Sequence, residues 1–124
     1  MRRKLLIADD ESGIRRLVRM TLAGEDFEIL EAVNGEEALT LARAENPHLL
    51  LLDVKMPRRN GLDVCRVLKD DPATQNIPIV ILTAQSQDAD EAAGRAAGAD
   101  FYFTKPFSPV ALVRKVDEIL LAAS

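Results

Sequence analysis

The segment His48-Leu49-Leu50-Leu51-Leu52-Asp53 is the most informative stretch of this sequence for the fold. Four consecutive leucines leave neither face of an extended strand polar, so other parts of the chain must cover both faces. Parallel sheets with helices on both sides provide such an environment for their central strands. The sequence therefore predicts a buried central strand over residues 48–53 that ends in a carboxylate.

The segments on either side of this strand alternate between short apolar runs and longer runs of helical period. Apolar residues of the helical runs recur every three or four positions, which is typical of amphipathic helices. Five strand–helix units in succession predict one α/β domain, residues 1–124, with a doubly wound parallel sheet. The predicted strands are residues 5–8, 27–32, 48–53, 78–83 and 101–103, and the predicted helices are residues 14–22, 35–46, 62–68, 88–97 and 112–120.

Capping residues mark the ends of the second helix. Asn34, followed three positions later by Glu37, is expected to cap its start, and Asn46-Pro47 is expected to end it. The helix at residues 88–97 has the weakest support, because its apolar side consists of alanines and because it contains Gly94. Small side chains bury little area, and glycine disfavours a helix interior. We therefore expect this helix to be the loosest of the five.

Composition restricts the class of protein. The chain has 124 residues, 16 basic and 20 acidic residues, and a net charge of −4. An acidic balance disfavours direct binding of nucleic acid, which requires a cationic surface. The single cysteine, Cys65, excludes an internal disulfide and a cysteine-based zinc site, and it is compatible with the expected cytoplasmic location. The longest apolar runs are too short to cross a bilayer, so no membrane association is expected.

Residues with useful chemistry gather where the predicted strands end. The carboxyl ends of parallel strands meet at one edge of a sheet, which is where ligands bind in open α/β folds. Neighbouring strands lie about 4.8 Å apart, so carboxylates that end neighbouring strands would crowd together and suit Mg²⁺. A metal beside a lysine and a hydroxyl could stabilise a phosphoryl group that an aspartate accepts. The residues at this edge are Asp9, Asp10, Asp53, Thr83 and Lys105.

Four sequence pieces together resemble the receiver domain of two-component response regulators, of the chemotaxis-regulator type. They occur in that family's order and spacing, and the resemblance covers essentially the whole chain. It implies a flavodoxin-like, five-stranded parallel sheet of strand order 2-1-3-4-5. The pieces are Ile7-Ala8-Asp9-Asp10-Glu11, Leu51-Leu52-Asp53-Val54-Lys55-Met56-Pro57 with Asn60-Gly61, Ile81-Leu82-Thr83-Ala84, and Gly98-Ala99-Asp100-Phe101-Tyr102-Phe103-Thr104-Lys105-Pro106-Phe107.

The resemblance implies a set of metal ligands. Asp10 would contact Mg²⁺ directly, and Asp9 would contact it mainly through water. Asp53 and the backbone carbonyl of Lys55 would complete the ligands that the protein supplies. Mg²⁺ is thus the expected cofactor.

The resemblance also implies the phosphorylation chemistry. Asp53 would be the phosphoacceptor, and Thr83 and Lys105 would bind the transferred phosphoryl group. Tyr102 would be the switch aromatic, which turns inward when Thr83 is drawn to the phosphate. The Lys105–Pro106 peptide bond is expected to be cis.

The resemblance further implies the partners. A histidine kinase or a histidine phosphotransfer protein would supply the phosphoryl group. Phosphorylation would change the face formed by the fourth helix, the fifth strand and the fifth helix, and this face would bind an output protein or a covalently linked effector domain. No effector domain is visible in residues 1–124. The chain would catalyse only its own phosphorylation and dephosphorylation, so we do not expect an enzyme that acts on a free metabolite.

Two positions concern the finer behaviour of the site. In the family, the residues two places after the phosphoacceptor and two places after the threonine tune dephosphorylation, and here they are Lys55 and Gln85. Neither is an acid that could activate water, so we expect a long-lived phosphorylated form. Asp100 is followed by Phe101, where many DNA-binding members have a second acid on the face through which they dimerise. That mode of dimerisation is therefore in doubt, and Phe101 and Phe103 could contact a partner or the core instead.

Other interpretations of these residues are weaker. The acids after the first strand could simply stabilise a helix N-terminus. A haloacid-dehalogenase-like Mg²⁺ phosphatase also uses an aspartate after a parallel strand, but it needs a second acid where Lys55 stands. A flavodoxin-like FMN carrier would be repelled by the acids Asp9-Asp10-Glu11. A phosphorylation-independent adaptor on the same fold remains an alternative, and all residues needed for phosphorylation are present.

Overall fold

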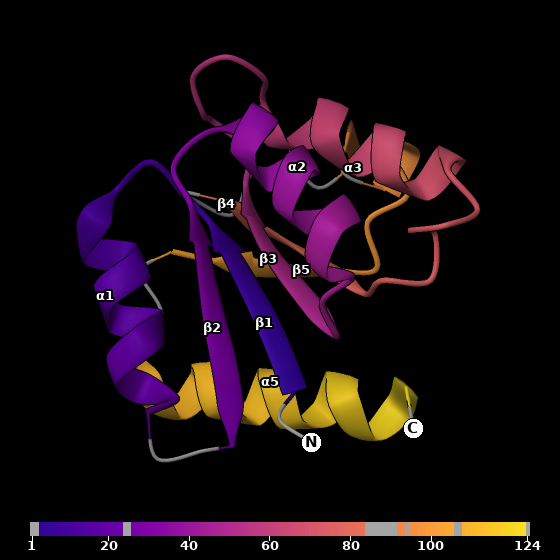
Figure 1. Cartoon of the computed structure of the whole chain (residues 1–124). Helices are drawn as coiled ribbons and strands as arrows, with labels where there is room; N and C mark the ends of the chain where they lie inside the picture. The colour runs from indigo at the N-terminus through magenta and orange to yellow at the C-terminus, as the bar shows by residue number, and fades with distance from the viewer. Residues whose placement is uncertain (1–2, 24–25, 84–91, 94, 106–107, 124) are drawn as a thin grey trace.

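A computed structural model describes residues 3–23, 26–83, 92–93, 95–105 and 108–123. Strands and helices alternate along the chain up to residue 83, as Figure 1 shows. The strands are β1 (Arg3–Ala8), β2 (Phe27–Ala32), β3 (Leu49–Asp53), β4 (Ile79–Thr83) and β5 (Phe101–Thr104). The helices are α1 (Ser12–Thr21), α2 (Gly35–Glu45), α3 (Gly61–Asp70) and α5 (Pro109–Ala123).

The five strands form one parallel sheet in the order β2-β1-β3-β4-β5. The change of direction in strand order falls between β1 and β3, which lie side by side in the middle of the sheet. The predicted fold class and strand order are therefore confirmed. The predicted ends of the strands also agree with the structure to within two residues.

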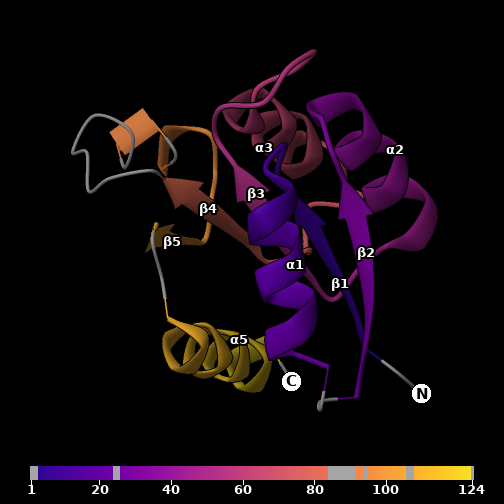
Figure 2. The ribbon, with the colours of Figure 1, turned by 90° about the vertical axis from the view of Figure 1, so that its left-hand side faces the viewer.

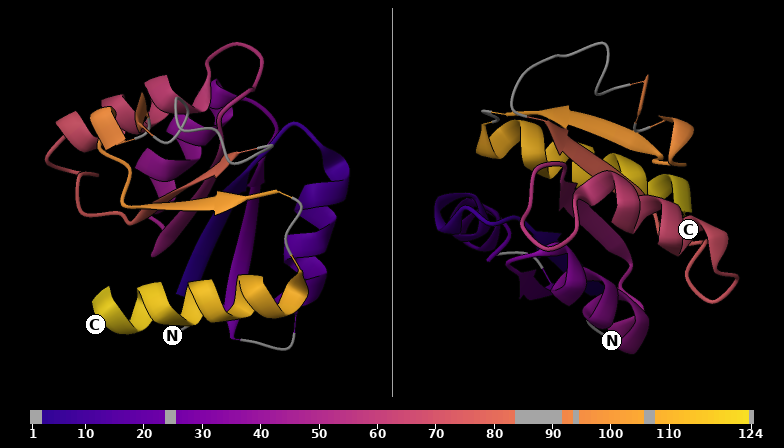
Figure 3. Two further views of the ribbon diagram at one scale, coloured as in Figure 1. Left: turned by 180° about the vertical axis from the view of Figure 1, so that it is seen from behind. Right: turned by 90° about the horizontal axis from the view of Figure 1, so that it is seen from above.

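The leucines of β3 explain why both faces of the sheet are covered. Leu50 and Leu52 face a core formed with α2 and α3, whereas Leu49 and Leu51 face a second core formed with α1 and α5. Figures 2 and 3 show these two helix pairs on opposite faces of the sheet. Every residue of β3 is buried, including Asp53 at its end. The central strand predicted from the sequence is thus confirmed.

Side chains that accept hydrogen bonds from the backbone define where α2 and α3 begin. The side chain of Asn34 accepts a hydrogen bond from the amide of Glu37, and Glu37 in turn accepts one from the amide of Val33. Asn46 ends α2 in the left-handed conformation, with φ of 46°. Asn60 caps α3 in the same way as Asn34 caps α2. The predicted capping residues of the second helix are confirmed.

The fourth predicted helix lies mostly outside the described residues. Ala92, Ala93, Arg95 and Ala96 are helical and lie between β4 and β5, whereas residues 84–91 and Gly94 are not described. The prediction that this helix is the loosest is therefore not tested. Among the described residues, no helix is both long and apolar enough to cross a membrane.

The aromatic residues of β5 divide between the two faces of the sheet. Phe101 and Phe103 are half-buried against the core of α1 and α5, so they contribute to packing inside this chain. Tyr102 packs on the opposite face, against the core of α2 and α3. The alternation follows from the two-residue period of a strand.

Shortening a β3 leucine should destabilise the fold strongly. Leu50 is fully buried, so Leu50→Ala is expected to lower the free energy of unfolding by about 2–5 kcal/mol. Leu121→Ala makes the same chemical change on a side chain that is 74% exposed, and it should cost about 0.5 kcal/mol or less. Urea unfolding followed by circular dichroism measures both. Equal losses in the two variants would contradict the assignment of Leu50 to the core.

Candidate functional site

The sheet register brings the predicted site residues to one edge. Ala8 at the end of β1 pairs with Leu52 in β3, so Asp9 and Asp53 follow at the same level of neighbouring strands. On the other side, Asp53 pairs with Leu82 of β4. The final pair of the sheet is Thr83 with Thr104, immediately before Lys105. The residues that meet at this edge are therefore Asp9, Asp10, Asp53, Thr83 and Lys105.

Three carboxylates form a cluster at this edge. One oxygen from each of Asp9, Asp10 and Asp53 lies within 4.8 Å of the others. Asp9 is completely buried and Asp53 is 6% exposed, whereas Asp10 is exposed to solvent. The amide of Glu11 donates a hydrogen bond of 2.9 Å to Oδ1 of Asp9, which fixes the orientation of that carboxylate.

Lys105 supplies the positive charge of the site. Its Nζ lies 2.7 Å from Oδ2 of Asp9, 3.3 Å from Oδ1 of Asp53 and 3.4 Å from Oε1 of Glu11. The side chain is 10% exposed, so its ion pairs with the buried Asp9 and Asp53 are shielded from solvent, whereas Glu11 is 64% exposed. The lysine thus joins the ends of β1, β3 and β5 across the face of the acidic cluster.

Burial and mutual repulsion perturb the titration of the site. Burial, together with the negative charge of Asp9, raises the pKa of Asp53 from its ordinary 3.8 to about 6, although Lys105 acts in the opposite direction. For Lys105, burial lowers the pKa, but contact with Asp9 and the charges of Asp53, Asp9 and Glu11 outweigh burial and raise it. Lys105 is therefore positively charged, and the carboxylates still carry unbalanced negative charge.

The cluster fits a hard divalent cation. Oδ2 of Asp9 is buried and accepts no hydrogen bond from the described residues, and it meets Lys105 as an ion pair. Carboxylate oxygens without nitrogen or sulfur ligands are the set that Mg²⁺ and similar cations prefer. A cation at this position would relieve the repulsion between carboxylates that, after burial, contributes to the raised pKa of Asp53. The group Asp9, Asp10 and Asp53 can therefore hold a metal ion.

The loop after Asp53 turns back tightly over the strand end. The amide of Gly61 donates a hydrogen bond of 2.8 Å to the carbonyl of Val54. A Cβ at Gly61 would collide with the backbone oxygen of Asp53, so glycine is required for this close approach. The loop over residues 54–60 therefore starts and ends beside the acidic cluster, and the exposed side chain of Lys55 lies within it.

The structure describes the remaining predicted residues only in part. Thr83 is the last residue of β4, and Tyr102 is half-buried beneath the Arg95 guanidinium, which lies 5.7 Å from the ring centre. Gln85 and Pro106 lie outside the described residues. The predicted role of Gln85 and the predicted cis bond before Pro106 are therefore not tested.

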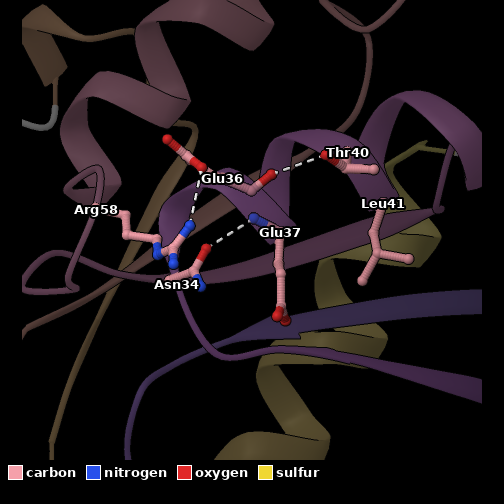
Figure 4. A pocket seen from close by; sticks show the side chains of 6 residues that line it. All are labelled: Asn34, Glu36, Glu37, Thr40, Leu41 and Arg58. Carbon is pink, nitrogen blue, oxygen red and sulfur yellow. Dashed lines mark hydrogen bonds and ion pairs between the residues drawn. The ribbon is translucent and has the colours of Figure 1, made fainter.

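A hollow of about 530 Å³ lies beside this edge but does not contain the cluster. Figure 4 shows Arg58 and Glu36 facing each other there, with a separation of 3.5 Å between Nη1 and Oε2. The two side chains are largely exposed, so their pairing contributes little to stability. The residues that line the hollow are Asn34, Glu36, Glu37, Thr40, Leu41 and Arg58, and none of them is a predicted site residue.

Sequence reasoning gave no specific role to two residues at the site. Glu11 contacts Lys105, as described above, and Arg15 donates a hydrogen bond of 2.8 Å from Nη1 to the carbonyl of Asp9. Glu11 and Arg15 are separated by about one turn of α1, which begins directly after the acidic run. The four-residue spacing between Glu11 and Arg15 was the feature of the sequence that could have indicated this contact. Side chains of a helix point toward its N-terminus, so Arg15 reaches back over the residues that precede the helix.

The sequence has close relatives among known regulators. It is 45% identical over 121 residues to the transcriptional regulatory protein ResD of Bacillus subtilis, covering 98% of this chain and 49% of that protein. It is 41% identical over 116 residues to the DNA-binding response regulator MtrA of Mycobacterium tuberculosis, covering 94% of this chain and 50% of that protein. The chain therefore spans about half the length of the curated relatives it matches.

Structural similarity leads to the same family. The chemotaxis response regulator CheY4 of Vibrio cholerae superposes with a TM-score of 0.90 and 28% sequence identity, covering 96% of this chain and 99% of that chain. The sequence also matches the family described as the response regulator receiver domain across residues 5–117. The resemblance inferred from the sequence pieces is confirmed. This chain belongs to the response regulator receiver domain family.

Proposed function

We propose that this chain is a phosphorylation-dependent switch in which Asp53 accepts a phosphoryl group with Mg²⁺ as cofactor. Membership of the receiver family and the acidic cluster support this proposal. The observation that carries it is the position of Lys105 Nζ, between Asp9 at 2.7 Å and Asp53 at 3.3 Å. A buried carboxylate flanked by a lysine and two further carboxylates has the parts that phosphoryl transfer requires.

The proposed reaction transfers the phosphoryl group from a phosphohistidine of a histidine kinase or a histidine phosphotransfer protein. One oxygen of the Asp53 carboxylate attacks phosphorus and forms an O–P bond, while the N–P bond breaks. The electron pair of the broken bond stays on the imidazole nitrogen, which takes up a proton. Lys105 offsets the negative charge of the phosphoryl oxygens, and Thr83 is the proposed hydroxyl partner.

Asp9, Asp10, Asp53 and the carbonyl of Lys55 are the proposed ligands of Mg²⁺. When bound, Mg²⁺ supplies positive charge that stabilises the phosphoryl oxygens during transfer. Burial of Asp9 and Asp53 limits the access of water to the reacting oxygens. The chain is proposed to catalyse only its own phosphorylation and dephosphorylation.

The proposed output is a change in binding. Tyr102 and Thr83 lie on adjacent strands, with Tyr102 in register with Ile81 and Thr83 in register with Thr104. A pull on Thr83 by the phosphoryl group would change the packing around Tyr102 and the face formed by the predicted fourth helix, β5 and α5. An output protein or a linked effector domain is proposed to bind this surface.

The residue at position 55 argues against the alternative function, a haloacid-dehalogenase-like phosphatase. Such an enzyme needs a second acid there to protonate the leaving group, and Lys55 is an exposed cation. If the chain were a phosphorylation-independent adaptor, the buried charge of Asp53 would have no function. The following experiment separates the adaptor from the switch.

Phosphoryl uptake should depend on Asp53 and on Mg²⁺. The protein incubated with acetyl phosphate and Mg²⁺ is expected to gain the mass of one phosphoryl group in intact-mass spectrometry. The gain should vanish in Asp53→Asn and in the presence of EDTA, because the nucleophile or the cation is then missing. Asp70→Asn is the matched control, since Asp70 is an exposed carboxylate at the end of α3.

If the mass measurement detects no phosphoryl group, binding of beryllofluoride distinguishes rapid hydrolysis from the absence of phosphorylation. If no phosphoryl adduct is detected but beryllofluoride binds the wild type and not Asp53→Asn, hydrolysis is faster than detection. If neither adduct forms on the folded wild type with Mg²⁺ present, the proposed switch is wrong and the adaptor is favoured.

The raised pKa of Asp53 predicts a pH-dependent stability difference. The folded-state pKa of about 6 lies above the ordinary 3.8, so the folded protein loses stability as pH rises through that interval. Asp53→Asn removes this penalty and should raise the free energy of unfolding by about 1–3 kcal/mol near pH 7.5 without metal. The gain should shrink toward about pH 4, where the carboxyl is protonated in the folded protein and increasingly so in the unfolded protein.

Urea unfolding of both proteins in EDTA at several pH values measures this difference. The attraction between Asp53 and Lys105 is one of the contributions to the Asp53 pKa of about 6. The expected increase in the free energy of unfolding therefore already includes the loss of this attraction. Asp70→Asn serves again as the control and should show no comparable gain. A stabilisation by Asp53→Asn that stays constant with pH would refute the titration assigned to Asp53.

Lys55 should prolong the phosphorylated state. Its ammonium group has donors and no acceptor, so it cannot accept a hydrogen bond from a water that attacks the phosphoryl group. Lys55→Asn introduces a carbonyl that can orient this water, and the variant should therefore lose the phosphoryl group faster than the wild type. Decay of the phosphorylated mass after removal of acetyl phosphate measures the two rates. Faster decay in the wild type would contradict the prediction.

A further inference from the structure

Arg15 reaches from α1 to the peptide group that joins two of the clustered aspartates. Its Nη1 donates a hydrogen bond of 2.8 Å to the carbonyl oxygen of Asp9. That oxygen belongs to the planar peptide unit between Asp9 and Asp10. A donor that fixes this oxygen therefore fixes the plane from which both side chains depart.

The backbone carbonyl of Asp9 lies just beyond the last residue pair of β1 and β2. The register of β1 with β2 ends at the pair Ala8–Ala32, and the Asp9 amide still donates to the carbonyl of Ala32 at 3.1 Å. The carbonyl of Asp9 lies beyond this last pair, and Arg15 provides its hydrogen bond. Without that bond, a largely buried backbone acceptor would lose its protein donor, which is unfavourable.

Arg15 is itself held by the edge strand. Its Nε donates to Oε1 of Glu31 at 3.1 Å, and the Arg15 side chain is only 16% exposed. The second oxygen of Glu31 accepts hydrogen bonds from Arg19, at 2.9 Å from Nε and 2.6 Å from Nη2. A guanidinium group is planar and rigid, so the bond to Glu31 sets the direction of the bond to Asp9.

We propose that Arg15, held by Glu31, is a positioning residue that orients the Asp9–Asp10 peptide so that both carboxylates converge with Asp53. This inference rests on the proposed function, because it concerns the geometry of the proposed Mg²⁺ ligands. It assigns a role to two residues that lie outside the acidic cluster and touch neither the cation nor the phosphoryl group.

The role is geometric rather than a simple supply of positive charge. Arg15 meets the cluster through the backbone carbonyl of Asp9, and its ion pair among the described residues is with Glu31, a carboxylate outside the cluster that also pairs with Arg19. Hydrogen bonding to Arg19, despite the opposing effect of burial, lowers the pKa of Glu31, and Arg15 adds to this effect. Glu31 is therefore ionised at neutral pH and keeps its hold on Arg15.

Mg²⁺ affinity is the first readout. Isothermal titration of MgCl₂ into Arg15→Gln is expected to show a dissociation constant about tenfold higher than that of the wild type. Glu31→Gln should show a smaller increase in the same direction, because Arg15 is kept but held less firmly. Arg16→Gln is the matched control, since Arg16 is an exposed neighbour on α1 with the same charge, and its affinity should equal that of the wild type.

Hydrogen exchange provides a second readout that needs no metal. The Glu11 amide is bonded to Oδ1 of Asp9, so its exchange rate reports the orientation of that carboxylate. Arg15→Gln should exchange this amide faster than the wild type and Arg16→Gln do, while the amides of β3 keep their rates. Unchanged β3 rates show that the effect is local and that the fold is intact.

The outcomes separate this inference from the proposed function. Equal Mg²⁺ affinities and equal Glu11 exchange in Arg15→Gln and Arg16→Gln would overturn the role of Arg15 while leaving the proposed function in place. If Arg15→Gln does not fold, Glu31→Gln decides the matter: an affinity equal to the wild type overturns the inference. If the folded wild type binds no Mg²⁺ and gains no phosphoryl group, the proposed function fails and this inference fails with it.

Discussion

Electrostatic repulsion at one edge of a buried sheet is the constraint on which the rest of the site depends. Parallel pairing of β1 and β3 brings Asp9 and Asp53 together, and burial removes the water that would otherwise screen them. The positive charge of Lys105 offsets part of this repulsion, because its Nζ lies 2.7 Å from Asp9 and 3.3 Å from Asp53. Burial, together with the negative charge of Asp9, still raises the pKa of Asp53 to about 6, so the lysine compensates only part of the cost of the buried charge. The site is therefore built to gain stability from a further positive charge.

The framework around the cluster is stiff because the sheet is covered on both faces. The leucines of β3 pack alternately against α2 with α3 and against α1 with α5, which fixes the strand that carries Asp53. Two further contacts restrain the loops at the edge. Gly61 allows the chain to return against the backbone of Asp53, and Arg15 donates to the carbonyl of Asp9. Charge that would otherwise push the carboxylates apart is thus resisted by packing and by hydrogen bonds to the backbone.

Most of the fold followed from patterns that are local in the sequence. The apolar run before Asp53 and the capping residue Asn34 gave a buried strand and a helix start where the structure has them. The strand order came from the family resemblance, since periodicity does not say which strands are neighbours. Phe101 and Phe103 could have contacted a partner or the core, and only the packing of α5 against the sheet decided for the core. Arg15 had no signal strong enough to single it out among the arginines of α1.

The sequence by itself determined the chemical inventory of this receiver domain: which residues end each strand, and that most of them are carboxylates beside one lysine and one threonine. It could do so because strand and helix periods, and motif spacing, are properties of neighbouring residues. Tertiary structure decided the distances, the burial and the pKa of Asp53, because these depend on side chains that are far apart in the chain. It also decided that Glu31 on an edge strand holds the arginine that bonds to Asp9, since strand pairing and helix packing alone bring those residues together.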